Sequence, residues 1–402
     1  MTRIELLEFI RNGENSGIEF KLDTLENRAL AKELVALANL EGGRVLLGVD
    51  DDGRIAGITR ENLEGWVMSA CRDKIRPEII PYFEIVKDVE PGRDVAIVQV
   101  LRGTTVHHVW HDNRRFYYIR VGSQSREASQ EELERLFQQR GAFRLEIRPV
   151  TGTSIADIDL RRLQDYFQRI RRQPFPDPQD EERLRTLLSN IEIVAEQDGK
   201  FPATIAGLLL FGTNPNRFLP QAGIDAAAYP GRVKDYATRE RARLRGPLTP
   251  LFGAAGLIEN GLVEQAIEFV NRNTPVRASL EHGRRVDQRM YPPEAVREAV
   301  VNALVHRDYL LSGTTIELST YQDRLEIISP GRLPNGITPA RMRVGCRSSR
   351  NQLLKDIMGD YGYLEHMGMG IPRKIVHLMR EQNGTEPELI EDGEQFILRL
   401  IA

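Results

Sequence analysis

Apolar residues recur with helical or strand-like spacing along the first 140 residues. Leu30, Leu34 and Leu37 follow one another at near-helical intervals, which predicts a helix over 26–39. Two glycines end that helix, and the apolar run after them predicts a strand over 44–49. Further helices are predicted at 4–10, 60–72 and 129–139, and further strands at 17–22, 82–86, 94–100 and 115–121. This mixture predicts an α/β domain over residues 1–140.

The rest of the chain divides into a middle segment and a C-terminal segment. The middle segment, residues 141–290, is predicted to be mainly helical, with helices at 157–171, 181–189 and 253–271 and a core strand at 208–211. Residues 291–402 alternate between helices at 294–306 and 371–381 and strands at 314–321, 324–329 and 395–401. This order predicts an α/β sandwich with helices on one face of a sheet, so the fold class of the whole chain is α/β (α+β).

Composition narrows the class of protein. The 402 residues are 41% hydrophobic and 28% charged, which is ordinary for a folded globular chain and argues against a disordered one. Apolar runs such as 206–211 fall far short of the roughly 20 residues that a membrane span needs. The two cysteines, Cys71 and Cys346, lie far apart and outside any metal-binding motif. We therefore expect reduced thiols in a cytoplasmic protein without a membrane partner.

The formal net charge of −3 hides local runs of one sign. Residues 232–245 carry six basic residues and two acids, residues 341–355 carry five basic residues and no acid, and residues 381–394 carry six acids. Each run could be an ordinary solvated face. Two basic runs nevertheless favour a phosphate-rich partner, either nucleic acid (DNA or RNA) or a nucleotide. The candidate phosphate contacts in the first run are Arg239, Arg241, Arg243 and Arg245.

Acids and a lysine gather in the N-terminal domain. Glu14, Glu19 and Lys21 lie around the first strand, and Asp50 follows the next one. Converging carboxylates can bind Mg²⁺ or Mn²⁺, and such a metal activates water in a phosphodiesterase. On composition alone, a polar turn at 50–52 and surface glutamates are the favoured interpretation.

Four ordered motifs favour a functional role for these acids over a simple polar turn. They read E-x-x-x-x-E-F-K, A-N-x-E-G-G, L-G-V-D-D-D-G-x-I-x-G and I-R-V-G-S. In this order and spacing the motifs resemble the Schlafen AlbA-type domain, and the resemblance covers about residues 1–140. It implies a nucleic-acid-binding module of the kind found in bacterial putative transcription regulators. Animal Schlafen relatives include RNA endonucleases that use two glutamates and an aspartate.

The resemblance assigns provisional roles to individual residues. Glu14 and Glu19 stand at the positions of the paired glutamates, and Asp50 is the best match to the aspartate, ahead of Asp52. These would be the catalytic and metal-binding acids, with Lys21 beside them. Lys21, and Arg120 in the last motif, are candidate nucleic-acid contacts.

His107, His108 and His111 form the one histidine cluster of the sequence. The i, i+4 spacing invites a metal-binding interpretation. No acid stands at useful spacing, and aromatic residues surround the histidines. A solvated loop that contacts nucleic acid is therefore the favoured interpretation.

A polar stripe runs along the helix predicted at 294–306. Glu298, Asn302 and His306 recur every four residues and so share one helical face. A hydrogen-bonded polar stripe in the core is one explanation. The motifs E-A-V-x-N-A-L-x-H-R-D-Y, L-E-I-I-S-P-G-R-L-P-N-G-I, R-N-Q-L-L and G-M-G-I-P-R favour another, because over 291–402 they resemble the RecG-like C-terminal domain of GHKL-type ATPases.

This second resemblance implies a site for ATP with Mg²⁺. Glu298 would orient water and Asn302 would bind the metal, next to His306. Ser329 and Gly331 stand at the base-binding box, where the family carries an aspartate and this chain does not. Gly368 and Gly370 stand at a short glycine box that faces the phosphates.

The combined prediction is a nucleic-acid-binding transcriptional regulator with a nucleotide-responsive C-terminal domain. Residues 207–222 resemble the linker found between the two modules. The alternative functions are a metal-dependent ribonuclease acting on tRNA or single strands, with antiphage defence as its setting, and an ATPase. Regulators of this type are usually multimeric, so a homo-oligomer is expected.

Overall fold

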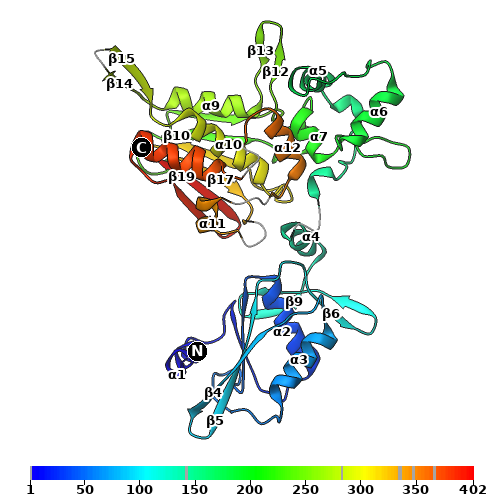
Figure 1. The fold of residues 1–402 in the computed structure, drawn as a ribbon, viewed down its shortest axis with the longest axis vertical. Helices are drawn as coiled ribbons and strands as arrows, with labels where there is room; N and C mark the ends of the chain where they lie inside the picture. The colour runs from blue at the N-terminus through cyan, green and yellow to red at the C-terminus, as the bar shows by residue number, and fades with distance from the viewer. Residues whose placement is uncertain (1, 141–143, 282–283, 334–336, 346–348, 365–367) are drawn as a thin grey trace. The chain divides into compact units, whose positions relative to one another are not determined.

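A computed structural model describes residues 2–140, 144–281, 284–333, 337–345, 349–364 and 368–402 (Figure 1). The chain forms two compact units, Met1–Phe143 and Arg144–Ala402, here called unit 1 and unit 2. Both units mix helices and strands, which confirms the α+β class. Cys346 lies outside the described residues.

Unit 1 is built on a four-stranded sheet with helices on both faces. The strand order is β1 (Ile18–Lys21), β2 (Gly42–Leu47), β5 (Arg93–Leu101) and β4 (Tyr82–Glu90), and the β1–β2 pair is parallel. Val45 and Leu47 of β2 join one core with α2 (Asn27–Asn39) and α3 (Leu63–Lys74). Leu46 points the other way, into a core with α1 (Arg3–Asn12).

Two small sheets complete unit 1. One contains β3 (Ile75–Arg76), β6 (His108–His111) and β7 (Arg114–Phe116), and the other contains β8 (Tyr118–Val121) and β9 (Gln124–Glu127). The histidine segment is therefore a β-hairpin and not the predicted loop. Helix α4 (Gln130–Gln139) ends the unit, with a capping box at Ser129.

Unit 2 is built on a six-stranded sheet. The strand order is β11 (Glu240–Leu244), β10 (Ile224–Ala228), β16 (Ile316–Thr320), β17 (Arg324–Pro330), β19 (Gln395–Ile401) and β18 (Glu388–Asp392). Helices α9 (Leu262–Asn273), α10 (Pro293–His306) and α13 (Leu378–Asn383) pack on it. Strands from both sides of residue 290 share this sheet, while the three-domain division of the chain stays a prediction.

The predicted strand at 208–211 is wrong, because those residues lie in helix α7 (Ile205–Phe211). Every residue of α7 is buried, and Thr204 caps the helix by accepting a hydrogen bond from the N–H of Gly207. A short segment that is apolar on all sides cannot be assigned to helix or strand by periodicity.

The remaining elements of unit 2 are short. The helical ones are η1 (Leu145–Ile147), η2 (Ile155–Asp157), α5 (Leu160–Asp165), η3 (Tyr166–Ile170), α6 (Glu181–Asn190), α8 (Pro215–Phe218), α11 (Pro339–Val344), α12 (Gln352–Asp360) and η4 (Gly370–His377). The hairpins are β12 (Leu251–Gly253) with β13 (Gly256–Glu259), and β14 (Val276–Glu281) with β15 (Arg284–Arg289).

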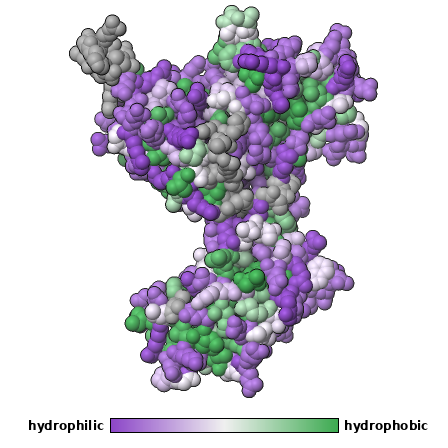
Figure 2. Space-filling view, viewed as in Figure 1, coloured by the Kyte–Doolittle hydropathy of each residue, from purple (hydrophilic) through white to green (hydrophobic). Residues whose placement is uncertain are grey.

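Polar residues cover most of the face displayed in Figure 2, with apolar residues in separate groups between them. Among the described residues, no helix has both the length and the apolar character to span a membrane. Cys71 is buried, and burial, followed by the nearby charge of Glu78, raises the pKa of its thiol to about 12.

Candidate functional site

The N-terminal acids converge on the ammonium group of Lys21. Nζ of Lys21 lies 2.8 Å from Oε1 of Glu19, 3.0 Å from Oδ1 of Asp51 and 3.9 Å from Oε1 of Glu14. Burial disfavours the charged lysine, but the hydrogen bonds to Glu19 and Asp51 outweigh it, so the pKa of Lys21 is raised. Burial, with a contribution from the charge of Glu19, raises the pKa of Glu14. The ammonium group thus takes the position between the acids.

The other oxygen of Glu19 belongs to a buried network around Arg120. Nη1 of Arg120 lies 2.5 Å from Oε2 of Glu19, and Nη2 donates to the carbonyls of Asn15 at 2.7 Å and Ile18 at 2.9 Å. Nη1 also donates to Glu33 at 3.4 Å. The side chain of Arg120 is 0% exposed. Arg120 therefore holds the acids in place and cannot reach a phosphate backbone.

The side chain of Asp50 stabilises the turn in which Asp50 lies. Its Oδ1 accepts hydrogen bonds from the N–H groups of Arg54 at 2.7 Å and Asp52 at 3.1 Å. Asp51, which the sequence reasoning did not single out, is the turn acid that reaches Lys21. Among the described residues no group of three or more acids, histidines or cysteines could hold a metal ion. The residues present thus fit a lysine-bridged acid cluster better than an Mg²⁺ or Mn²⁺ site.

The basic run of the middle segment is partly neutralised. Arg245 pairs with Asp225 at 2.7 Å. Arg241 and Arg243 are exposed on the same side of β11, and Arg239 is exposed just before the strand. Arg239, Arg241 and Arg243 therefore remain candidates for phosphate contacts, whereas Arg245, just after β11, is held by Asp225 and the carbonyl of Ile224.

The three histidines of the hairpin diverge. The ring Nδ1 of His107 lies 2.8 Å from the carbonyl of Pro77, in a buried position. His108 faces outward beside Tyr117, and His111 lies 3.2 Å from Asp112 at the hairpin turn. Because successive strand residues face opposite sides, the i, i+4 spacing that suggested a metal site has no helical meaning here.

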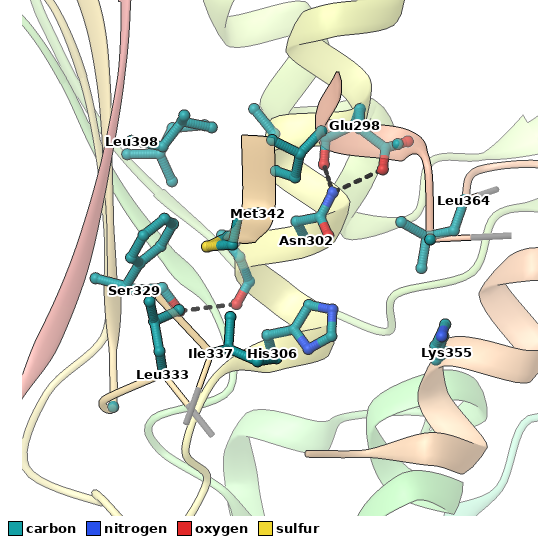
Figure 3. A pocket seen from close by; sticks show the side chains of 18 of the residues that line it. Glu298, Asn302, His306, Ser329, Leu333, Ile337, Met342, Lys355, Leu364 and Leu398 are labelled. Carbon is teal, nitrogen blue, oxygen red and sulfur yellow. Dashed lines mark hydrogen bonds between the residues drawn. The ribbon is translucent and has the colours of Figure 1, made fainter. Parts of the chain in front are cut away.

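A cavity of about 1010 Å³, part of it open to solvent, lies between α10, β17, β19 and the glycine loop (Figure 3). The structure brings all seven predicted cofactor residues into its lining: Glu298, Asn302, His306, Ser329, Gly331, Gly368 and Gly370. Its other walls are largely apolar, made by Leu333, Ile337, Met342, Leu364, Phe396 and Leu398.

Glu298 and Asn302 form one polar wall of the cavity. Nδ2 of Asn302 donates to Oε1 of Glu298 at 2.8 Å and to its carbonyl at 2.7 Å, so the amide nitrogen is fixed toward Glu298. Oδ1 of Asn302 accepts no hydrogen bond from the described residues. Mg²⁺ prefers carboxylate and amide oxygens and usually completes its shell with phosphates and water. These two residues therefore fit a magnesium ion that arrives with a nucleotide.

Gly370 packs directly against this wall. A β-carbon at position 370 would collide with the carboxylate of Glu298, which is 5% exposed. Gly370 also begins η4, so backbone N–H groups without helical partners lie at this end of the cavity. Only glycine permits this approach of helix start and carboxylate.

His306 and Lys355 give the cavity a second polar end. Burial, followed by the charges of Lys355 and Arg350, lowers the pKa of His306 to about 4, so its ring is neutral at pH 7. Lys355 of α12 lines the cavity beside it, and its ammonium group forms no ion pair with any residue in the described ranges. The sequence reasoning missed Lys355; its one signal was membership of the acid-free run 341–355.

Arg350 and Asn351 of the R-N-Q-L-L motif support the cavity without lining it. Nδ2 of Asn351 donates to the carbonyls of Val305 and Arg307, and Arg350 donates to the carbonyl of His306. These bonds satisfy backbone oxygens at the end of α10. Ser329 donates its hydroxyl to the carbonyl of Ala303 at 2.9 Å and so joins β17 to α10.

A helix with a carboxylate–amide pair, a glycine loop and strands of the six-stranded sheet thus meet at one cavity. Two parts of the chain match known families, and one of these parts includes β17, β19 and the glycine loop. Residues 313–400 match the family described as "Putative ATP-dependent DNA helicase recG C-terminal", directly after α10, and residues 14–129 match "Schlafen, AlbA_2". The chain therefore carries a Schlafen AlbA_2 domain and a RecG-like C-terminal domain, which confirms both resemblances.

Residues 134–225 match "Domain of unknown function (DUF8451)". A crystal structure of the DIP2311 protein from Corynebacterium diphtheriae is similar, with 21% identity and a TM-score of 0.46, over 96% of this chain and 75% of that one. At this level the likeness says nothing about function. No curated protein matches the chain. The two domains indicate a function related to nucleic acid, and the ATPase-like domain is compatible with ATP and Mg²⁺.

Proposed function

We propose that unit 2 binds a nucleotide with Mg²⁺ and that the chain is a nucleic-acid-binding regulator, most simply of transcription. The observation that carries the proposal is that seven residues from three separate sequence motifs line one cavity. We also expect a cytoplasmic homo-oligomer.

The polarity of the cavity suggests how the nucleotide lies. The apolar wall of Leu333, Phe396 and Leu398 suits a base, while Lys355 and the start of η4 suit phosphates. Ser329 brings no carboxylate to the base, so the pocket lacks the group that reads adenine in the family. ATP and GTP should therefore bind with affinities within about ten-fold of each other, because no strong hydrogen-bond discrimination is built in.

The regulatory half of the proposal predicts that nucleotide changes nucleic-acid affinity. Fluorescence anisotropy of labelled DNA and RNA oligonucleotides, measured over a salt series with and without ATP and Mg²⁺, tests it. Affinity should fall steeply with salt, and ATP should shift it in the wild type but not in Gly370→Ala. An affinity that ignores both salt and ATP would contradict the regulator.

A second candidate is a metal-dependent ribonuclease, for which antiphage defence is a fitting role. It is favoured by the convergence of Glu14, Glu19 and Asp51 and opposed by the Lys21 ammonium group between them. Cleavage of tRNA and of single strands with Mn²⁺ or Mg²⁺ should then depend on Glu19 and Asp51. If wild type and Glu19→Gln leave the substrates equally intact, the ribonuclease is excluded.

Nucleotide hydrolysis is a separate question at the unit 2 cavity. An ATPase that uses Glu298 to orient water should release phosphate in the wild type and lose that activity in Glu298→Gln. Equal phosphate release by the two proteins would reject this role for Glu298, and nucleotide binding without turnover fits the regulator.

A further inference from the structure

The sheet formed by β3, β6 and β7 has one face fixed in the core of unit 1. Ile75, Val109 and Phe116 lie on that face, and all three pack in the cluster made with α2 and α3. Ile75 and Val109 are fully buried. This support makes the opposite face of the hairpin a rigid surface rather than a mobile loop.

Four side chains form the opposite face, here called the hairpin face: Arg76, His108, Trp110 and Arg115. Arg76 stands opposite His108, and Trp110 stands opposite Arg115, so the four are direct cross-strand neighbours. Trp110 is 37% exposed, and both arginines are exposed. An exposed tryptophan between arginines is not needed to stabilise the sheet, whose core lies on the other face.

Aromatic rings continue across the hairpin face. The ring centroids of His108 and Trp110 are 6.4 Å apart, and those of His108 and Tyr117 are 5.1 Å apart. Burial, then the charges of Arg115, His107 and Arg76, lowers the pKa of His108, so its ring is neutral at pH 7. The three rings offer adjacent flat surfaces on which planar groups can stack.

No acidic residue in the part of the chain that the structure describes pairs with the cations of the hairpin face. Arg115 forms no hydrogen bond or ion pair through its side chain with any described residue, and Arg76 donates only to the carbonyls of Arg72 and Ile75. Elsewhere in unit 1 an exposed arginine such as Arg126 is neutralised by Glu132 at 2.7 Å. The hairpin face therefore keeps its positive charge for an external anion.

We propose that the hairpin face binds single-stranded nucleic acid, with bases stacked on Trp110 and its neighbouring rings and phosphates held by Arg115 and Arg76. Stacking on aromatic rings combined with backbone contacts to cations is the chemistry that recognises single strands without reading sequence. A duplex hides the faces of its bases, so it would use the arginines and leave the rings unoccupied. This site deepens the nucleic-acid-binding half of the proposed function and rests on it.

Intrinsic fluorescence can observe the site directly, because the chain has two tryptophans. Trp66 lies under the guanidinium of Arg60 at 4.2 Å and packs against the core. In the full chain carrying Trp66→Phe, only Trp110 emits. Titration with oligothymidylate and oligouridylate should quench that emission. The dissociation constant from the quenching curve should equal the one measured by fluorescence anisotropy. In Trp110→Phe, which keeps Trp66, the same titration should leave the emission unchanged.

Affinity measurements complete the test. Trp110→Ala should weaken binding about ten- to hundred-fold at constant salt. Arg115→Ala should reduce the slope of log affinity against log salt by about 0.7, whereas the matched loss of charge in Arg11→Ala should leave it unchanged. Arg11 is an exposed arginine in the last turn of α1 that forms no ion pair with any described residue.

Three outcomes would overturn the proposal in distinguishable ways. Binding without quenching of Trp110 would place the site elsewhere and leave the nucleic-acid-binding function standing. Equal quenching by a duplex of the same sequence would reject single strands as the ligand. Absence of binding by the folded wild type to any oligonucleotide would overturn both this site and the nucleic-acid half of the proposed function.

Discussion

Replacing Lys355 with alanine should weaken the binding of phosphate-bearing nucleotides and leave nucleoside binding unchanged. Lys355 lines the cavity together with His306, and its ammonium group forms no ion pair with any described residue. A triphosphate that enters the cavity gains this charge as a partner without breaking an existing ion pair. Adenosine carries no negative charge, so its affinity should be the same in Lys355→Ala and in the wild type.

The expected size of the effect follows from the half-buried position of the lysine. At 4 Å and an effective dielectric constant of 20, two unit charges attract by about 4 kcal/mol. Fully exposed pairs are worth only about 0.2–1 kcal/mol, because water and salt screen them. An intermediate value of about 1–2 kcal/mol corresponds to a loss of roughly 5- to 30-fold in affinity.

Isothermal titration of the full chain with ATP, ADP and adenosine measures this effect. Lys200→Ala is the matched control, because Lys200 is an exposed lysine of unit 2 that does not line the cavity. Affinity for ATP and ADP should fall in Lys355→Ala and hold in Lys200→Ala. Equal affinity of Lys355→Ala and wild type for ATP would refute the contact between Lys355 and the phosphates. A loss of adenosine affinity equal to the loss of ATP affinity would refute it as well.

Three further predictions concern stability and access. Arg120→Ala removes the buried cation that pairs with both Glu19 and Glu33, so unit 1 should lose about 3–5 kcal/mol of its free energy of unfolding and its melting temperature should fall by about 10 °C or more in calorimetry. An unchanged melting temperature would contradict the role of Arg120 in holding these two acids. His306 has a pKa of about 4 in the folded chain and 6.5 as its ordinary value, so the unfolded chain binds the proton first as pH falls. Between pH 6.5 and 4 the wild type should therefore lose up to about 3 kcal/mol of stability that His306→Gln does not lose, measured by urea unfolding at pH 7 and 5; identical pH profiles would refute a neutral buried ring. Gly370→Ala should reduce ATP affinity at least ten-fold in the same titration, because its methyl group displaces Glu298, whereas Gly313→Ala, at an open turn away from the cavity lining, should leave ATP affinity unchanged.

The helical stripe was the part of the site best accessible from sequence. Glu298, Asn302 and His306 needed only the period of the helix to be placed on one face, and α10 keeps that period over its whole length. Glycines 331, 368 and 370 could be attached to the same site only through the resemblance to a family, because they lie far along the chain. The cavity then follows from how β17, β19 and η4 pack around α10.

Side-chain direction limited the prediction elsewhere. Asp50 and Asp51 are adjacent in one turn, and only the turn geometry decides that Asp51 reaches Lys21 while Asp50 accepts from its own backbone. Arg120 reads as a surface cation in sequence, yet it is buried by contacts more than 80 residues away. The hairpin face could not be predicted from sequence for a similar reason. Whether Trp110 stands opposite Arg115 depends on the register of β6 and β7.

Binding of ATP to the full chain, measured by isothermal titration with and without Mg²⁺, tests the central claim most directly. We predict one site per chain in the wild type, tighter with Mg²⁺, and loss of the Mg²⁺-dependent gain in Asn302→Ala, because Oδ1 of Asn302 is the amide oxygen offered to the metal. Absence of ATP and GTP binding at millimolar concentration by the folded wild type would contradict a nucleotide site in this cavity. An Mg²⁺ effect equal in wild type and Asn302→Ala would contradict the assigned metal ligand.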